Sequence, residues 1–228
     1  MVFREDGRKG GREWQCPGVM AYEKRNGILR GGNGREDKSE PRRHIGLGED
    51  GEGCGKMDRS GDQEIVEYKN PWFRVIRKGK FYYVDEPMAH NAAVVFIEFQ
   101  GQLVLIEQYR VAAGCVLLAT PRGYGEGQET SAACAVREAF EETGFRVSER
   151  DLKYLGKVRP NSAILTSVVD VYFGVAKENR AEHLDTEEVA RVVLCSYDEF
   201  ERKVTDGYVT DGFTLAGYLL LRMKRESG

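Results

Sequence analysis

The chain has 228 residues, of which 41% are hydrophobic and 31% are charged, and its formal net charge is −3. This length suits one ordinary domain with an additional segment, and this composition suits a globular protein with an apolar core. The small net charge argues against attraction to nucleic acid or to a membrane surface. No apolar run approaches the roughly 20 residues that a transmembrane helix needs, so we expect neither kind of partner.

The cysteines and histidines follow no metal-binding or disulfide pattern. There are five cysteines and three histidines, no two cysteines form a C-x-x-C pair, and the histidines share no ligand spacing. The N-terminus, MVFREDGRKG, lacks the apolar core of a secretion signal and contains acids that are unusual in transit peptides. We therefore expect a cytoplasmic protein with reduced cysteines and no zinc site.

Residues 1–60 differ in composition from the rest of the chain. The stretch 31–43, GGNGREDKSEPRR, combines glycine with both charges and has almost no apolar periodicity. Such a segment cannot bury enough surface to offset the entropy of ordering it. We predict a disordered extension over residues 1–60 and a folded domain over residues 61–228. An alternative interpretation is that Met57, just before the first strand-like run, is the true start.

An N-terminal β segment is predicted over residues 61–90, because three short runs there are rich in β-branched and aromatic residues. A hairpin of two buried strands follows, joined by Gly101 and Gln102. Residues 91–228 then form the remainder of the domain. The strands predicted up to this hairpin are 64–68, 72–76, 80–84, 91–99 and 103–109.

A helix is predicted after a glycine-rich loop at 121–127. Thr130 or Ser131 is the N-cap, residues 132–143 form the body, and Gly144 ends the helix. The mixture of strands with few helices gives an α/β or α+β fold. The later predicted elements are strands at 152–158, 168–175 and 189–195, and helices at 197–205 and 213–223.

The predicted helix carries three glutamates on one face. Glu138, Glu141 and Glu142 stand at i, i+3 and i+4, a spacing at which each pair of like charges costs about 0.2–0.5 kcal/mol in an isolated helix. A bound cation would reverse that cost, and carboxylate oxygens are ligands that Mg²⁺ prefers. The preceding loop leads into a helix N-terminus, which favours anions. The plainer interpretation is a solvated acidic helix face.

The spacing of the whole segment 123–145 favours a functional site. Its sequence, GYGEGQETSAACAVREAFEETGF, matches G-x5-E-x7-R-E-U-x-E-E-x-G-U, where U is apolar. Ala139 occupies a position where a larger aliphatic residue is usual. The segment therefore resembles the Nudix box, and the chain is similar to Nudix hydrolases over about residues 64–224. This resemblance implies an α/β/α sandwich with a mixed sheet, in which residues 91–228 are the catalytic core.

Shorter segments resemble the ADP-ribose pyrophosphatase branch of this family. This branch usually has an acid two positions before the proline of P-R-G, where the present chain has Ala119. That departure concerns the choice of substrate and not the diphosphate chemistry. The matching segments are QYR at 108–110, PRGYGE at 121–126, a proline at 160 and DGFTL at 211–215.

The resemblance also implies a role for each residue that matches the box. Glu138 and Glu142 match the positions that bind metal, and Glu141 is a further ligand or an acid that orients water. The carbonyl of Arg122 matches a backbone contact to the metal. Arg137 matches the arginine that holds the glutamates through ion pairs.

Substrate contacts are expected from the same loop and from one strand end. Gly123 and Gly125 let the backbone approach a ligand closely, and Arg122 lies beside them. Arg110 is a candidate phosphate contact, although an ion pair at a strand end explains it as well. Glu129 matches a position that ties the loop to the helix.

The general base is expected from a loop well after the box. Glu188, in LDTEEVARV at 184–192, is the first candidate. Glu187 is the reserve, and a box glutamate is the third choice.

The activity that the resemblance implies is Mg²⁺-dependent hydrolysis of the pyrophosphate bond of a small nucleoside diphosphate derivative. ADP-ribose, cleaved to AMP and ribose 5-phosphate, is the first-choice substrate, and Mn²⁺ is an alternative metal. Another nucleotide sugar, or a dinucleotide of the NADH type, is the alternative substrate. A non-catalytic metabolite sensor is the other alternative; sensors typically lose a box glutamate, and none is missing here. The branch commonly forms homodimers, so a homodimer is expected as well.

Overall fold

The computed structural model describes residues 63–179 and 189–226. The predicted extension over residues 1–60, and the candidate bases Glu187 and Glu188, lie outside the described residues.

A small antiparallel sheet comes first among the described residues. Its strands form from short runs of aromatic and β-branched residues, which favour strands. They pair in chain order. The backbone of Val84 in the third strand exchanges hydrogen bonds with a later loop. Its N–H donates to Ile164 O at 2.7 Å, and its carbonyl accepts from Thr166 N at 3.0 Å. The strands are β1 (Glu64–Lys69), β2 (Arg74–Lys78) and β3 (Phe81–Asp85).

A seven-stranded mixed sheet forms the centre of the fold. Its path is β12-β5-β4-β10-β9, with β6 paired to β5 and β7 paired to β4. β10 runs parallel to β4, whereas the other pairs are antiparallel. The strands are β4 (Ala93–Phe99), β5 (Gln102–Arg110), β6 (Cys115–Ala119), β7 (Arg122–Gly123), β9 (Lys153–Val158), β10 (Val169–Val175) and β12 (Val189–Cys195).

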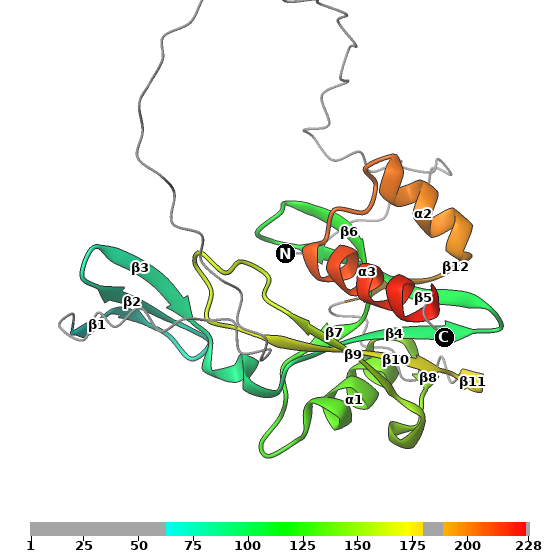
Figure 1. Ribbon diagram of the computed structural model, residues 1–228, viewed down its shortest axis with the longest axis horizontal. Coiled ribbons are helices and arrows are strands. Elements are labelled where there is room, and N and C mark those ends of the chain that lie inside the picture. Colours follow the sequence, from blue (N-terminus) through cyan, green and yellow to red (C-terminus); the bar gives the residue numbers. More distant parts are fainter. Residues whose placement is uncertain (1–62, 180–188, 227–228) are drawn as a thin grey trace, which may run out of the picture. The chain divides into compact units, whose positions relative to one another are not determined.

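Helices cover both faces of this sheet (Figure 1). Successive residues of β4 point to opposite faces, so its buried apolar run serves two cores. Ala93, Val95 and Ile97 pack with α1, whereas Val94 and Phe96 pack with α2 and α3. This arrangement confirms the predicted α/β/α sandwich. The helices are α1 (Ser131–Thr143), α2 (Tyr197–Thr205) and α3 (Gly212–Glu226).

The ends of α1 follow from its capping residues. Of the two candidate caps, Thr130 is the N-cap, and its hydroxyl accepts a hydrogen bond from Ala133 N at 3.1 Å. Gly144 adopts a left-handed φ of 71° after the last turn, a conformation that glycine adopts without a steric cost. The helix therefore spans the predicted segment and begins one residue earlier.

Several elements were not predicted, and most of them have only two or three residues, too few to show a periodicity. The first hairpin turns at Gln100 and Gly101, both with positive φ, so the predicted turn at Gly101 and Gln102 was one residue late. The missed elements include β6 and β7 of the large sheet, the pair β8 (Phe145–Arg146) and β11 (Glu178–Asn179), and the 3-10 helices η1 (Pro87–Asn91) and η2 (Glu149–Asp151).

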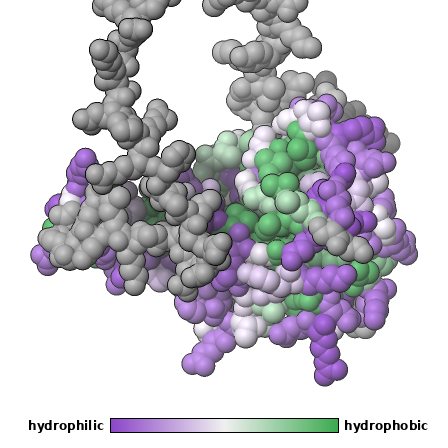
Figure 2. Space-filling model, in the orientation of Figure 1, coloured by the Kyte–Doolittle hydropathy of each residue, from purple (hydrophilic) through white to green (hydrophobic). Residues whose placement is uncertain are grey.

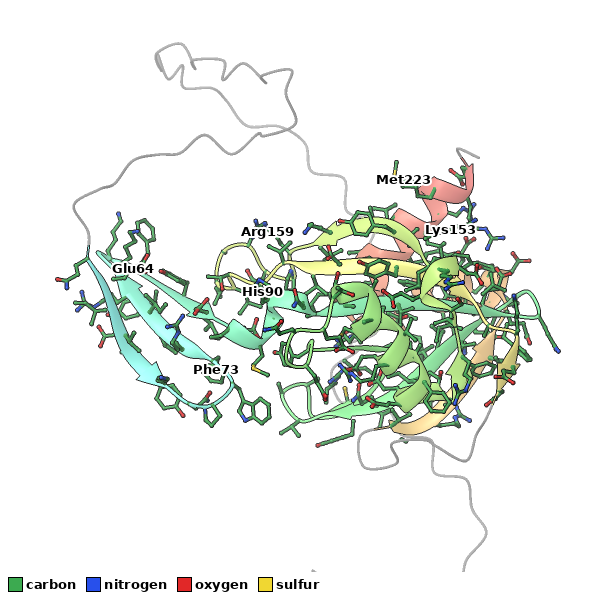
Figure 3. All side chains as sticks on the ribbon, turned by 90° about the horizontal axis from the view of Figure 1, so that it is seen from below. Glu64, Phe73, His90, Lys153, Arg159 and Met223 are labelled. Carbon is green, nitrogen blue, oxygen red and sulfur yellow. The ribbon has the colours of Figure 1, made fainter. Side chains whose placement is uncertain are left out.

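The outer surface of α3 is partly apolar. Leu219 and Met223 are exposed, and hydrophobic residues appear among hydrophilic ones on the side of the molecule that α3 occupies (Figure 2). Met223 projects away from the strands (Figure 3). Even so, among the residues that the structure describes, none of the helices is both long and apolar enough to cross a bilayer.

Gly217 in α3 gives a direct test of this packing. A Cβ at this position would lie 2.6 Å from Cε2 of Phe96, whereas a Cβ at Gly212 would meet no atom within 4 Å. Overpacking costs about 1–3 kcal/mol, which exceeds the roughly 1 kcal/mol that alanine gains over glycine within a helix. Gly217→Ala should therefore lower the urea midpoint of unfolding, and the control Gly212→Ala should not. Equal midpoints for wild type and Gly217→Ala would show that the packing is looser than described.

Candidate active site

Two carboxylates of α1 meet two consecutive residues of β7. The N–H of Arg122 donates to Oε2 of Glu142 at 3.0 Å. The Glu138 carboxylate occupies the space beside Gly123, where an added Cβ would lie 2.0 Å from Oε1. Consecutive Cα atoms are about 3.8 Å apart, so both acids are held against the same short length of backbone.

The two loop glycines have packing roles in this arrangement. Gly123 leaves room for Glu138, as described above. A Cβ at Gly125 would lie 2.6 Å from Cβ of Asn91, whose amide donates to Glu129 O at 2.7 Å. The close approach predicted for both glycines is thus an approach to neighbouring protein atoms, and their contact with substrate stays a prediction.

Arg137 connects the acids of the box. Its guanidinium donates to Glu138 at 2.7 Å and to Glu141 at 2.9 Å, and it also contacts Glu129 at 3.1 Å and the carbonyl of Tyr124 at 2.8 Å. Although burial works against the charge, these carboxylates raise the pKa of Arg137. Arg137 is therefore a permanent cation that orients the glutamates.

Glu129 is part of the same network. Burial would raise its pKa, but hydrogen bonds from Arg137 and from the N–H of Glu126 outweigh that effect and lower it. This carboxylate is therefore ionised near neutral pH. It ties the loop before α1 to the helix, as the resemblance implied.

Glu142 has the least favourable environment for a negative charge. It is 4% exposed, and this burial raises the pKa of its carboxyl to about 8, with the charge of Glu138 acting in the same direction against the hydrogen bond from Arg122. A nearby cation would remove this penalty. The two carboxylates therefore fit a divalent metal, which prefers such ligands.

The third predicted ligand is more exposed than this pair. Glu141 is half exposed and bonded to Arg137. Accordingly, within residues 63–179 and 189–226 no three His, Cys, Asp or Glu side chains form a preassembled metal cluster. The helical spacing brought Glu138 and Glu142 to β7 but left Glu141 at the edge.

The side chain of Arg122 is engaged from the opposite side of the sheet. Its guanidinium donates to Oδ2 of Asp211 at 2.8 Å and lies 5.0 Å from the ring centre of Phe213. Burial would raise the pKa of Asp211, but the charge of Arg122 and hydrogen bonds from Thr214 lower it. The PRGYGE and DGFTL segments, noted separately in the sequence, thus meet in space.

Arg110 ends β5 near the acids. Burial raises the pKa of Glu142 and that of Tyr124, and the charge of Arg110 opposes part of each rise. The described chain resumes at Val189, which pairs with Gln108 in the same strand. Val189 therefore lies beside the end of β5, and the role of Glu188 stays a prediction.

Sequence reasoning missed a polar cluster around Glu86. The Tyr124 hydroxyl donates to Glu86 at 3.0 Å, and the Ser167 hydroxyl donates to its other oxygen at 2.7 Å. Burial and the Glu86 charge raise the pKa of Tyr124 to about 12. These residues come from three distant segments without a shared motif, so no local signal links them.

The sandwich and the inward-facing glutamates of α1 define the architecture of a Nudix-type domain. The NUDIX domain family model matches residues 88–211, more than half of the chain. The chain therefore belongs to the Nudix family, whose hydrolases act on diphosphate bonds.

Individual proteins resemble this chain over part of its length. A structure described as "Crystal structure of ADP compounds hydrolase" superposes with a TM-score of 0.60 at 18% identity, covering 72% of this chain and 92% of that one. A methanol dehydrogenase activator of Bacillus methanolicus is 24% identical over 134 residues, which is 58% of this chain and 71% of that protein. Putative nudix hydrolase 2 of Caenorhabditis elegans is 35% identical over 120 residues. That match covers 49% of this chain and 51% of the worm protein, so the chain spans about half the length of the latter.

The burial of Glu142 predicts a pH dependence of stability in metal-free protein. Its folded pKa of about 8 lies above its ordinary value of 4.5, so the folded state holds a proton that the unfolded state releases between these values. The contribution of this proton to the free energy of unfolding is complete below pH 4.5 and is lost as the pH rises through 8. In EDTA, the free energy of unfolding of Glu142→Gln should fall less from pH 5 to 8 than that of wild type. If the free energies of unfolding of wild type and Glu142→Gln changed with pH in parallel, this would contradict a protonated Glu142 carboxyl in the folded protein.

Proposed function

We propose that the protein hydrolyses the pyrophosphate bond of a nucleoside diphosphate derivative, with Mg²⁺ held by Glu138 and Glu142 and with ADP-ribose as substrate. The observation that carries this proposal is the pairing of two carboxylates, the buried Glu142 and the partly buried Glu138, against β7. The carbonyl of Arg122 and the more exposed Glu141 are the proposed further ligands. When bound, Mg²⁺ supplies concentrated positive charge that offsets the carboxylates and the diphosphate; Mn²⁺ has the same ligand preference.

The residues around the metal ligands have separate tasks in this proposal. Arg137 holds Glu138 and Glu141 in orientation through its ion pairs. Arg110 adds positive charge for the phosphate groups at the end of β5. Glu188 accepts a proton from the attacking water, with Glu187 and a box glutamate as the alternatives. Attack of this water at phosphorus yields AMP and ribose 5-phosphate from ADP-ribose.

The choice of ADP-ribose rests on similarities outside the box. The segments around Arg110, Arg122 and Asp211 resemble the ADP-ribose pyrophosphatase branch, and Arg122 and Asp211 are in contact. The structural neighbour that is described as an ADP compounds hydrolase supports the same class of substrate. Other nucleotide sugars and dinucleotides of the NADH type remain the alternative substrates, because the proposed metal site contacts only the diphosphate.

The departure at position 119 has a structural reason. Ala119 is 1% exposed and packs with Ile106 and Val189. An acid here would be buried among apolar side chains at a high cost. Substrate positioning in this protein must therefore come from another residue. The homodimer implied by the resemblance stays a prediction.

A substrate panel tests the proposed activity. Purified protein with Mg²⁺, and separately with Mn²⁺, is offered ADP-ribose, other nucleotide sugars, NADH and diadenosine polyphosphates, and the nucleotide products, such as AMP from ADP-ribose, are measured. We expect kcat/KM for ADP-ribose to exceed the others by roughly tenfold or more, and EDTA to abolish turnover. A smaller preference would favour one of the alternative substrates, and binding of ADP-ribose without turnover would favour a sensor.

Variants of single carboxylates test the proposed roles. Glu138→Gln should lower kcat by roughly 10²–10⁴ while the fold remains, because it removes a charged ligand of similar shape. Glu149→Gln, an exposed acid of η2, is the matched control and should leave kcat unchanged. Among the candidate bases, Glu188→Gln should cost far more activity than Glu187→Gln. Full activity in Glu138→Gln would remove this residue from the mechanism.

A further inference from the structure

The first turn of α3 contains a buried polar centre. Asp211 and Thr214 are both buried, and one oxygen of Asp211, Oδ2, accepts three hydrogen bonds. These come from Thr214 N at 2.9 Å, from the Thr214 hydroxyl at 2.7 Å and from Arg122 at 2.8 Å. Only the first of these bonds is needed to cap a helix.

The Thr214 hydroxyl makes a second link to the same segment. It accepts a hydrogen bond from the N–H of Thr120 at 3.0 Å, and the Thr120 hydroxyl donates to Val95 O in β4 at 2.6 Å. The α3 turn therefore holds residues on both sides of Pro121. Proline has no N–H to donate, although the Pro121 carbonyl accepts a hydrogen bond from Val95 N at 3.0 Å. The flanking links therefore add to the pairing of β7 with β4 in setting the path of the chain into β7.

This path ends at the proposed metal site. The side chain of Arg122 bonds to Asp211, and its backbone N–H bonds to Glu142. α1 and α3 lie on opposite faces of the sheet (Figure 1). The segment 120–122 is thus contacted by the acid-bearing helix from one side and by the cap of α3 from the other.

We infer that Asp211 and Thr214 are positioning residues, which act through Arg122 and Thr120 to hold β7 at the distance from Glu142 that cation binding requires. This inference rests on the proposed function, because it takes β7 and Glu142 as part of the metal site. Residues that hydrogen-bond to a metal ligand and so orient it contribute strongly to metal affinity, although they do not touch the metal.

A plain capping role for Asp211 is the competing explanation, and α2 supplies the comparison. Ser196 caps α2 with its hydroxyl, which accepts from Glu199 N at 3.2 Å. Loss of either cap should lower thermal stability in a similar way. Only the loss of Asp211 should also change the site.

Binding of Mn²⁺, measured by electron paramagnetic resonance on the full chain, separates these roles without turnover. Asp211→Ala should raise the Mn²⁺ Kd roughly 10- to 100-fold. Asp211→Asn should retain most of the affinity, because the amide oxygen can accept the same hydrogen bonds. Ser196→Ala should bind as wild type does. Should Asp211→Ala not fold, Thr214→Val removes one hydroxyl at similar size and should weaken binding in the same direction.

Coupling between the two residues is tested by a double-mutant cycle on the same Mn²⁺ Kd. If Asp211 acts through Arg122, the two substitutions should not have independent effects on the Mn²⁺ Kd. The double variant Arg122→Ala/Asp211→Ala should then show a smaller increase in Kd than the two single increases multiplied together. The inference would be overturned if Asp211→Ala bound Mn²⁺ with wild-type affinity, or if Ser196→Ala lost as much Mn²⁺ affinity as Asp211→Ala. It would also be overturned if the wild-type protein bound no Mn²⁺. If the expected pattern appears but no diphosphate is cleaved, the proposed function fails while the positioning role stands.

Discussion

Two carboxylates of one helix face two consecutive residues of a short strand, and the surrounding structure is arranged around that contact. Glu142 is buried with a raised pKa, and a Cβ at position 123 would displace the Glu138 carboxylate from its place beside β7. Two neighbouring acids, one of them buried, are unfavourable unless a cation or a proton offsets the charge. The fold keeps this pair in place with the cation Arg137 at one side and the backbone N–H of Arg122 at the other.

The central strand β4 connects the elements on both sides of this contact. Its alternating buried residues join α1 to one face and α3 to the other, while its first residues pair directly with β7. The acid-bearing helix, the strand that it faces and the helix that holds that strand from behind therefore share one scaffold. Sites held by regular elements are more accurately positioned than sites held by loops, and metal binding depends on that accuracy.

Local patterns predicted the parts of the site that are close in sequence. The spacing of the glutamates, the cap at Thr130 and the stop at Gly144 all depend on a few neighbouring residues, and α1 was predicted to within one residue. The strand β7 has only two residues and so no periodicity to detect. The contact between Arg122 and Asp211 joins positions 89 residues apart, and no local signal determines such a pairing. Helical spacing likewise placed Glu141 with its neighbours but could not show that Arg137 holds it at the edge.

The state of Glu142 can be measured through the proton that it must lose when a divalent cation binds. With a pKa of about 8, this carboxyl is protonated at pH 7, and a metal binds only its ionised form. Calorimetric titration of Mg²⁺ at pH 7, in buffers of different ionisation enthalpy, should show release of about one proton by the wild-type protein and of almost none by Glu142→Gln. Binding of Mg²⁺ to the wild type without proton release would contradict the pair of Glu138 and the buried Glu142 as the metal site.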